Sequence, residues 1–153
     1  MARPNSFQTI YLDSSALIAV IQNEKGCDPI KQVLALADRR ILTVYASPLI
    51  LVEVRGQRRG ENDVGRDRKA LEIFDGRVTR IDLNRKVALR ARQYVGVHRL
   101  KPPDAIHLAS AVEAAVDIMW TLDKDFQHLW QNTVDGVWVD EPYEFGQQAF
   151  PGL

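Results

Sequence analysis

Short apolar runs alternate along this chain with longer segments in which apolar residues recur every three or four positions. The runs at residues 9–12, 42–46, 78–83, 118–122 and 137–139 predict buried strands. The longer segments predict helices over residues 14–21, 28–37, 47–55, 68–74, 84–95 and 104–112. Strands that alternate with helices favour a parallel arrangement. The pattern therefore predicts an α/β fold, a three-layer α/β/α sandwich with a mostly parallel central sheet.

Polar residues, prolines and glycines mark the boundaries of the predicted helices. Ser14 or Ser15 is a candidate cap for the first helix, and Asn84 is a candidate for the helix over residues 84–95. The double proline at residues 102–103 predicts a break, after which Asp104 opens the last helix. Three glycines between residues 55 and 69 predict a loop or a broken helix in that segment.

The length of 153 residues fits one domain, with its core at about residues 9–140 and an acidic tail at 141–153. The single cysteine, Cys27, excludes an internal disulfide and a cysteine-rich zinc site. No apolar run reaches the roughly 18–20 residues of a membrane span, and the first residues lack the apolar stretch of a signal peptide. We therefore expect a cytoplasmic protein that does not enter a membrane.

A net charge of zero conceals two regions of opposite sign. Residues 55–101 carry 14 basic and 6 acidic side chains, whereas residues 102–153 carry 1 basic and 9 acidic side chains. A basic segment rich in arginine is typical of proteins that bind a phosphate backbone. The alternative is that these charges only solvate the outer faces of helices.

Carboxylates occur at the ends of predicted strands and in the first turns of predicted helices. In open α/β sheets ligands bind beyond the carboxyl ends of the strands. The carboxylates come from four separate places along the chain: Asp13, Glu53, Asp104, and the pair Asp123 and Asp125. Crowded carboxylates repel one another unless a cation balances them, and sites made only of oxygen ligands suit Mg²⁺ or Mn²⁺. Helix caps and turn residues are the structural alternative for the aspartates. That alternative does not account for Glu53, which lies in an apolar stretch and needs a partner if buried.

Four stretches carry these acids in a recognisable order: YLDSSAL at 11–17, SPLILVE at 47–53, PPDAIHLASA at 102–111 and TLDKDF at 121–126. Together they resemble the PIN-domain ribonucleases, and most closely the VapC-type toxins of bacterial and archaeal toxin–antitoxin pairs. The resemblance covers about residues 10–139 and implies a PIN-like fold. It also implies that an acidic quartet surrounds a metal ion: Asp13, Glu53, Asp104 and Asp123.

The resemblance gives each matched residue an expected role. Asp13, Asp104 and Asp123 are the implied metal ligands, and Glu53 is either a ligand or a base that orients the attacking water. The positions that support the site are matched by Ser14, Thr121 and Asp125. His107 lies one helical turn after Asp104, where a packing or hydrogen-bonding role is the simpler interpretation.

The implied activity is metal-dependent hydrolysis of RNA that leaves a 3′-hydroxyl and a 5′-phosphate. The arginines expected to hold the RNA backbone are Arg55, Arg58 and Arg59, with Arg66 and Arg68 beside them. The implied partners are a VapB-type antitoxin that covers the acidic groove and a second copy of the chain in a homodimer. Three alternatives remain: a PIN nuclease of RNA processing, a PIN binding module without turnover, and a phosphoryl-transfer enzyme of the haloacid-dehalogenase kind. The last would want an acid at position 15, where the sequence has serine.

Overall fold

The computed structural model describes residues 2–56 and 63–146. Within these ranges the strands form one sheet in the order β3-β2-β1-β4-β6-β5. The strands are β1 (Thr9–Leu12), β2 (Thr43–Ala46), β3 (Thr79–Arg80), β4 (Ile118–Trp120), β5 (Asn132–Val134) and β6 (Val137–Asp140). All neighbouring pairs are parallel except β5 and β6, which are antiparallel. The prediction of a mostly parallel sheet is therefore confirmed.

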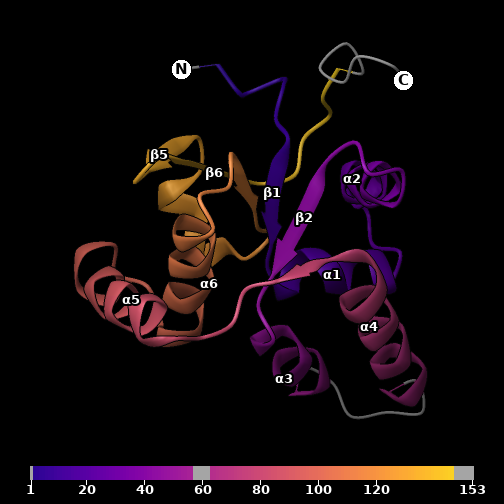
Figure 1. The fold of residues 1–153 in the computed structure, drawn as a ribbon, viewed down its shortest axis with the longest axis horizontal. Helices are drawn as coiled ribbons and strands as arrows, with labels where there is room; N and C mark the ends of the chain where they lie inside the picture. Colours follow the sequence, from indigo (N-terminus) through magenta and orange to yellow (C-terminus); the bar gives the residue numbers. More distant parts are fainter. Residues whose placement is uncertain (1, 57–62, 147–153) are drawn as a thin grey trace.

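Helices cover both faces of this sheet (Figure 1). They are α1 (Ser14–Ile21), α2 (Asp28–Asp38), α3 (Leu49–Gly56), α4 (Asp63–Arg77), α5 (Arg85–Val97) and α6 (Pro102–Glu113), with a 3₁₀ helix η1 (Lys124–Leu129). In Figure 1, α1 to α4 lie on one side of the central strands, and α5 and α6 lie on the other. The three-layer α/β/α arrangement is therefore confirmed. No helix in the described ranges is long and apolar enough to cross a membrane.

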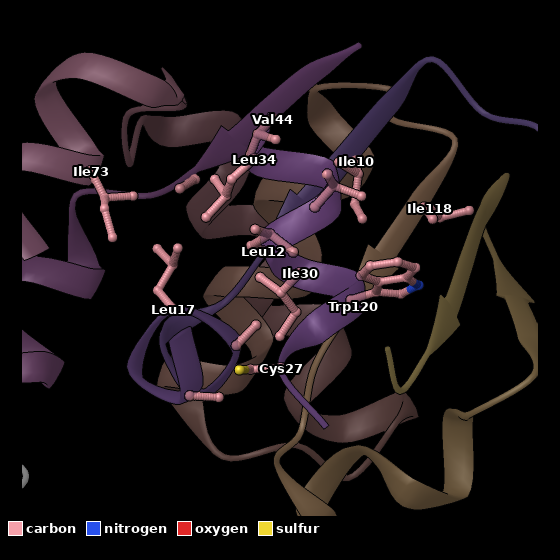
Figure 2. Packing of buried hydrophobic residues seen from close by; sticks show 14 of the residues in the cluster. Ile10, Leu12, Leu17, Cys27, Ile30, Leu34, Val44, Ile73, Ile118 and Trp120 are labelled. Atoms are coloured by element: carbon pink, nitrogen blue, oxygen red, sulfur yellow. The ribbon is translucent and has the colours of Figure 1, made fainter. Parts of the chain in front are cut away.

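Alternation along β1 builds both halves of the core, because successive side chains of a strand point to opposite faces. Ile10 and Leu12 are fully buried in the cluster formed with α1, α2 and α4 (Figure 2). Tyr11 points to the other face and is fully buried with Leu108 and other side chains of α5 and α6.

The order of the strands creates one place where the chain direction reverses. From β1 the chain moves outward through β2 to β3, and α5 and α6 then bring it back to β4 on the other side of β1. Ligands of open α/β sheets bind at such a switch point, beyond the carboxyl ends of the two diverging strands. Here those strands are β1 and β4.

The two ends of the described chain pack against each other. Tyr143 and Phe145 lie against Trp120 of β4, and Phe7 contacts both Trp120 and Phe145. The Tyr143 hydroxyl donates a hydrogen bond of 2.6 Å to the backbone carbonyl of Pro4. The buried core thus includes side chains on both sides of residues 9–140.

Two helix starts differ from the sequence predictions. Asp13, not Ser14 or Ser15, caps α1, because its carboxylate accepts a hydrogen bond from the backbone N–H of Ala16. The double proline does not precede α6 but forms its first turn, so Asp104 lies inside the helix. Proline is tolerated there because the first N–H groups of a helix have no partner within it. The predicted cap Asn84 does bond the backbone N–H of Val87.

Four elements differ in extent or were not predicted. The helix predicted over residues 68–74 is the longer α4, anchored by buried Ala70, Ile73 and Phe74. The strand predicted over 78–83 pairs only at Thr79 and Arg80, because its partner β2 ends at Ala46. Neither η1 nor the antiparallel strand β5 was predicted.

We predict that Tyr143→Ala lowers the free energy of unfolding by about 2–4 kcal/mol, because it uncovers Trp120 and leaves a cavity. Tyr143→Phe is the matched control and loses only the hydrogen bond to Pro4, worth about 1 kcal/mol. Urea denaturation of the three proteins measures both values. A small and equal loss in the two variants would show that residues 141–146 do not belong to the core.

Candidate metal site

Three carboxylates converge beside the carboxyl ends of the central strands. Asp104, Asp123 and Asp125 each offer one oxygen, and these oxygens all lie within 4.8 Å of one another. Asp104 is buried in the first turn of α6, whereas the side chain of Asp125 is 46% exposed. The cluster therefore has one side against the protein core and one side open to solvent.

Local backbone structure places each member of this cluster. Pro102 and Pro103 start α6 and put Asp104 in its first turn, where the helix dipole favours an acid. Asp123 follows β4 and caps η1 by accepting a hydrogen bond of 2.9 Å from the backbone N–H of Asp125. The end of a strand and the starts of two helices thus deliver the three carboxylates together.

Asp13 lies next to this cluster but is not one of its three members. Its carboxylate is buried and accepts hydrogen bonds from the hydroxyls of Ser15 and Thr121 and from the N–H of Ala16. The Thr121 hydroxyl also accepts a hydrogen bond of 3.1 Å from the backbone N–H of Asp123. Thr121 therefore joins Asp13 to the segment that carries Asp123 and Asp125.

Burial and mutual repulsion make this region hard to ionise fully. Burial, followed by the charges of Asp123 and Asp13, raises the pKa of Asp104 to about 7. Burial likewise raises the pKa of Asp13, although the hydrogen bonds it accepts oppose the shift. At the rim, the ammonium group of Lys101 lies 3.0 Å from a carboxylate oxygen of Asp125 and partly balances the cluster.

Glu53 lies in a separate arrangement and is hydrogen-bonded on both oxygens. Its Oε1 is 2.6 Å from Nε2 of His107, and its Oε2 accepts a hydrogen bond of 2.7 Å from Ser14. Burial disfavours its charged form, but the bonds to His107 and Ser14 outweigh that effect and lower the pKa of Glu53. The same carboxylate, with Asp13 and Asp104, outweighs burial and raises the pKa of His107.

The donor set fits a hard divalent cation. It contains only carboxylate oxygens in close range, with hydroxyls behind them, and Mg²⁺ or Mn²⁺ needs few protein ligands because it keeps several waters. Burial, followed by the charges of Asp123 and Asp13, raises the pKa of Asp104, and a bound cation would oppose that shift. A further strand-end acid, Asp140, is already paired with Arg3 at 2.8 Å and so does not need a cation.

The structure places the predicted site residues in two groups. Asp104, Asp123 and Asp125 form the cluster, with Asp13 and Thr121 beside it. Glu53 and Ser14 bond each other, and Glu53 also bonds His107, which lies on α6 three residues after Asp104.

The predicted arginines lie on or near the segment between α3 and α4. Arg55 belongs to the last turn of α3, and Arg66 and Arg68 belong to α4. The side chain of Arg55, together with Arg58 and Arg59, falls outside the residues that the structure describes.

Three residues of this region were not among the predicted site residues. Ser15 bonds Asp13 and accepts a hydrogen bond from the backbone N–H of Leu122. Tyr11 bonds His107, and Lys101 pairs with Asp125. A signal existed for Tyr11, because period-two alternation puts it on the same side of β1 as Asp13. No comparable pattern in the sequence distinguishes Lys101 from other exposed lysines.

We predict that the metal-free protein in EDTA is less stable at pH 8 than at pH 5, by about 1–3 kcal/mol. Folded Asp104 keeps its proton up to about pH 7, whereas the unfolded chain releases it near its ordinary pKa of about 4. Between these values the folded state binds more protons, so stability falls as the pH rises. The raised pKa values of Asp13 and His107 act in the same direction.

Urea denaturation at the two pH values measures this difference, and Asp104→Asn is the control. The variant is expected to show a smaller fall, because an amide does not titrate. Equal stability of the wild type at both pH values, or an undiminished fall in the variant, would contradict the electrostatic description of the cluster.

A family model described as PIN domain matches residues 10–130 of the chain. No curated protein gives a match. Among solved structures, the fold resembles a chain of a toxin–antitoxin complex from Klebsiella pneumoniae, with a TM-score of 0.64 and 22% identity over 89% of this chain and 99% of that one.

Two further structures are comparably similar. VapC20 of Mycobacterium tuberculosis, described as a sarcin–ricin loop cleaving toxin, gives a TM-score of 0.63 at 16% identity over 82% of this chain and 97% of that one. A chain of DNA-bound VapBC from Salmonella typhimurium gives 0.62 at 18% identity over 89% and 99%. At these identities the likeness shows a shared fold. The family match spans most of the sequence, and the chain belongs to the PIN domain family.

Proposed function

We propose that this PIN domain protein is a metal-dependent endoribonuclease and the toxin of a type II toxin–antitoxin pair. The observation that carries the proposal is the convergence of the carboxylates of Asp104, Asp123 and Asp125 at the switch point of the sheet, with Asp13 buried beside them. The similarity of the fold to VapC20 and to chains of toxin–antitoxin complexes supports it.

The metal ligands in this proposal come from the acids of the cluster and from Asp13 beside it. Asp13, Asp104 and Asp123 are the ligands that the sequence suggests, and the position of Asp125 adds it to this set. A bound Mg²⁺ or Mn²⁺ would supply charge neutralisation at the scissile phosphate and a lowered pKa for a bound water. Ser15 and Thr121 hold the Asp13 carboxylate in place by hydrogen bonds.

We assign Glu53 the role of the base that takes a proton from the attacking water. Its carboxylate is held on both sides, is partly exposed and has a lowered pKa, so it is ionised at neutral pH and can accept a proton. In the reaction, the water oxygen bonds to phosphorus and the bond to the 3′ oxygen breaks. The products are a 5′-phosphate and a 3′-hydroxyl, whose proton comes from solvent.

Positive charge at the rim would recruit the RNA, because bare carboxylates repel it. Lys101 is 74% exposed and lies beside the cluster, so its ammonium group can turn from Asp125 to a phosphate oxygen. We assign the same role to Arg55, Arg58 and Arg59.

The proposed partners follow from the same assignment. A VapB-type antitoxin would cover the acidic groove, and the toxin would act in the cytoplasm as a homodimer. The support is the resemblance of the fold to chains of the toxin–antitoxin complexes from Klebsiella pneumoniae and Salmonella typhimurium.

We predict that the purified protein cleaves a mixed RNA pool with Mg²⁺ or Mn²⁺ and not with EDTA, and that Asp104→Asn lowers the rate about 100-fold or more. Asp104 is the sharper target because Asp13 also caps α1, so replacing Asp13 would disturb the fold as well. Gel analysis of 5′-labelled RNA measures the cleavage.

The matched control is Asp38→Asn, which removes an acid that pairs with Arg77 on the surface of α2 and α4. It should keep full activity. Cleavage that survives in EDTA or in Asp104→Asn would contradict the proposed site. Binding of RNA without cleavage by folded, metal-loaded protein would favour a PIN binding module.

A further inference from the structure

A chain of hydrogen bonds runs through the core from β1 to the Glu53 carboxylate. The Tyr11 hydroxyl lies 2.7 Å from Nδ1 of His107, and Nε2 of His107 lies 2.6 Å from Oε1 of Glu53. The three side chains come from β1, α6 and α3. These two hydrogen bonds therefore connect the central strand β1 to the helices α6 and α3.

The first two members are inside the protein. Tyr11 is fully buried and His107 is 1% exposed, whereas Glu53 is 22% exposed. A buried hydroxyl or imidazole is costly unless it is hydrogen-bonded, and here each polar atom satisfies another. The arrangement leads outward, from two groups hidden from solvent to a carboxylate that solvent can reach.

Both nitrogens of the His107 ring are engaged from opposite sides, which fixes the ring. A carboxylate can only accept, so Nε2 carries the proton and donates it to Glu53. The ring of Tyr11 also meets the ring of His107 edge to face, with centroids 5.8 Å apart. His107 therefore cannot turn away from Glu53 without breaking its contact with Tyr11.

Glu53 itself is restrained on each carboxylate oxygen. His107 donates to Oε1, and the Ser14 hydroxyl donates to Oε2 at 2.7 Å. A free glutamate side chain loses conformational entropy when it is fixed. Here the Glu53 side chain has already lost that entropy in the folded protein, before any substrate binds. Each oxygen accepts one hydrogen bond in this arrangement and keeps a second lone pair for another donor.

We propose that His107 is a positioning residue, which Tyr11 holds from behind so that the Glu53 carboxylate keeps the one orientation in which it can take a proton from the attacking water. The inference rests on the proposed function, in which Glu53 performs that step. It gives His107 a role beyond packing, and it gives Tyr11 a role that its burial alone does not suggest.

The test compares three variants by steady-state cleavage of one RNA substrate. His107→Leu keeps the approximate volume and removes both hydrogen bonds, so kcat should fall about 10- to 100-fold, the usual effect of losing a residue that orients a reacting group. His107→Gln places an amide N–H near the position of Nε2 and should recover part of that loss. Tyr11→Phe removes one hydroxyl and should lower kcat by about threefold to tenfold. KM and the affinity for Mn²⁺ should stay unchanged in all three.

Tyr94→Phe is the matched control. Tyr94 is also a buried tyrosine, and its hydroxyl bonds Asp135 at the turn between β5 and β6, which is not part of the acidic cluster. It should cleave RNA like the wild type. Unchanged kcat in His107→Leu, equal loss in His107→Leu and His107→Gln, or a loss explained by weaker Mn²⁺ binding would overturn the proposal.

A crystal structure of His107→Leu gives a second answer that does not depend on cleavage. The Glu53 carboxylate should leave its present place or occupy several rotamers, whereas it should stay fixed in Tyr94→Phe. A Glu53 side chain that keeps its orientation in His107→Leu would overturn the positioning role even if the protein proved not to be a nuclease. If cleavage fails in the wild type while Glu53 moves in the variant, the proposed function fails and the positioning contact stands. Tyr11→Phe, which is nearly isosteric, serves in both experiments if His107→Leu does not fold.

Discussion

Repulsion among the carboxylates beside the ends of β1 and β4 is the constraint that the surrounding structure has to meet. Hydroxyl groups offset part of this repulsion; the Thr121 hydroxyl, for example, donates a hydrogen bond to the Asp13 carboxylate. Cationic groups offset another part of the repulsion; Lys101, for example, forms an ion pair with Asp125. The repulsion that these groups do not offset acts on Asp104, whose pKa rises to about 7 because burial and the neighbouring acids disfavour its charge. A divalent cation would neutralise the remaining repulsion. The cluster of carboxylates therefore indicates both a metal site and a fold whose stability depends on pH.

The parts of the fold that depend on local sequence could be predicted. The run that forms β1 and the cap at Asn84 are set by short-range patterns, and both are present. The missed hairpin of β5 and β6 also had a local signal, because Asp135 and Gly136 both have positive φ, as a two-residue hairpin turn of Asp-Gly requires. The length of α4 had no such signal. Its glycine at position 65 argues against a helix, and burial of Phe74 in the shared core overrides it.

The candidate site likewise has features that could be predicted from the sequence and features that could not. Acids at strand ends could be placed at one edge of the sheet from the topology that the sequence implies. The partners of each acid could not, because they depend on side-chain directions across elements distant in sequence. Ser14 and Ser15 look interchangeable in the sequence, yet Ser14 bonds Glu53 and Ser15 bonds Asp13. In the same way, nothing local indicates that His107 joins β1 to α3.

The metal site is tested most directly by anomalous diffraction from crystals soaked in Mn²⁺. The expected result is a strong anomalous peak within about 2.0–2.3 Å of carboxylate oxygens of Asp104 and of Asp123 or Asp125, at a Mn²⁺ concentration that supports RNA cleavage. The same soak of Asp104→Asn should give a weaker peak or none. A peak at another place in the protein, or no peak between these carboxylates, would contradict the assignment of this cluster as the metal site.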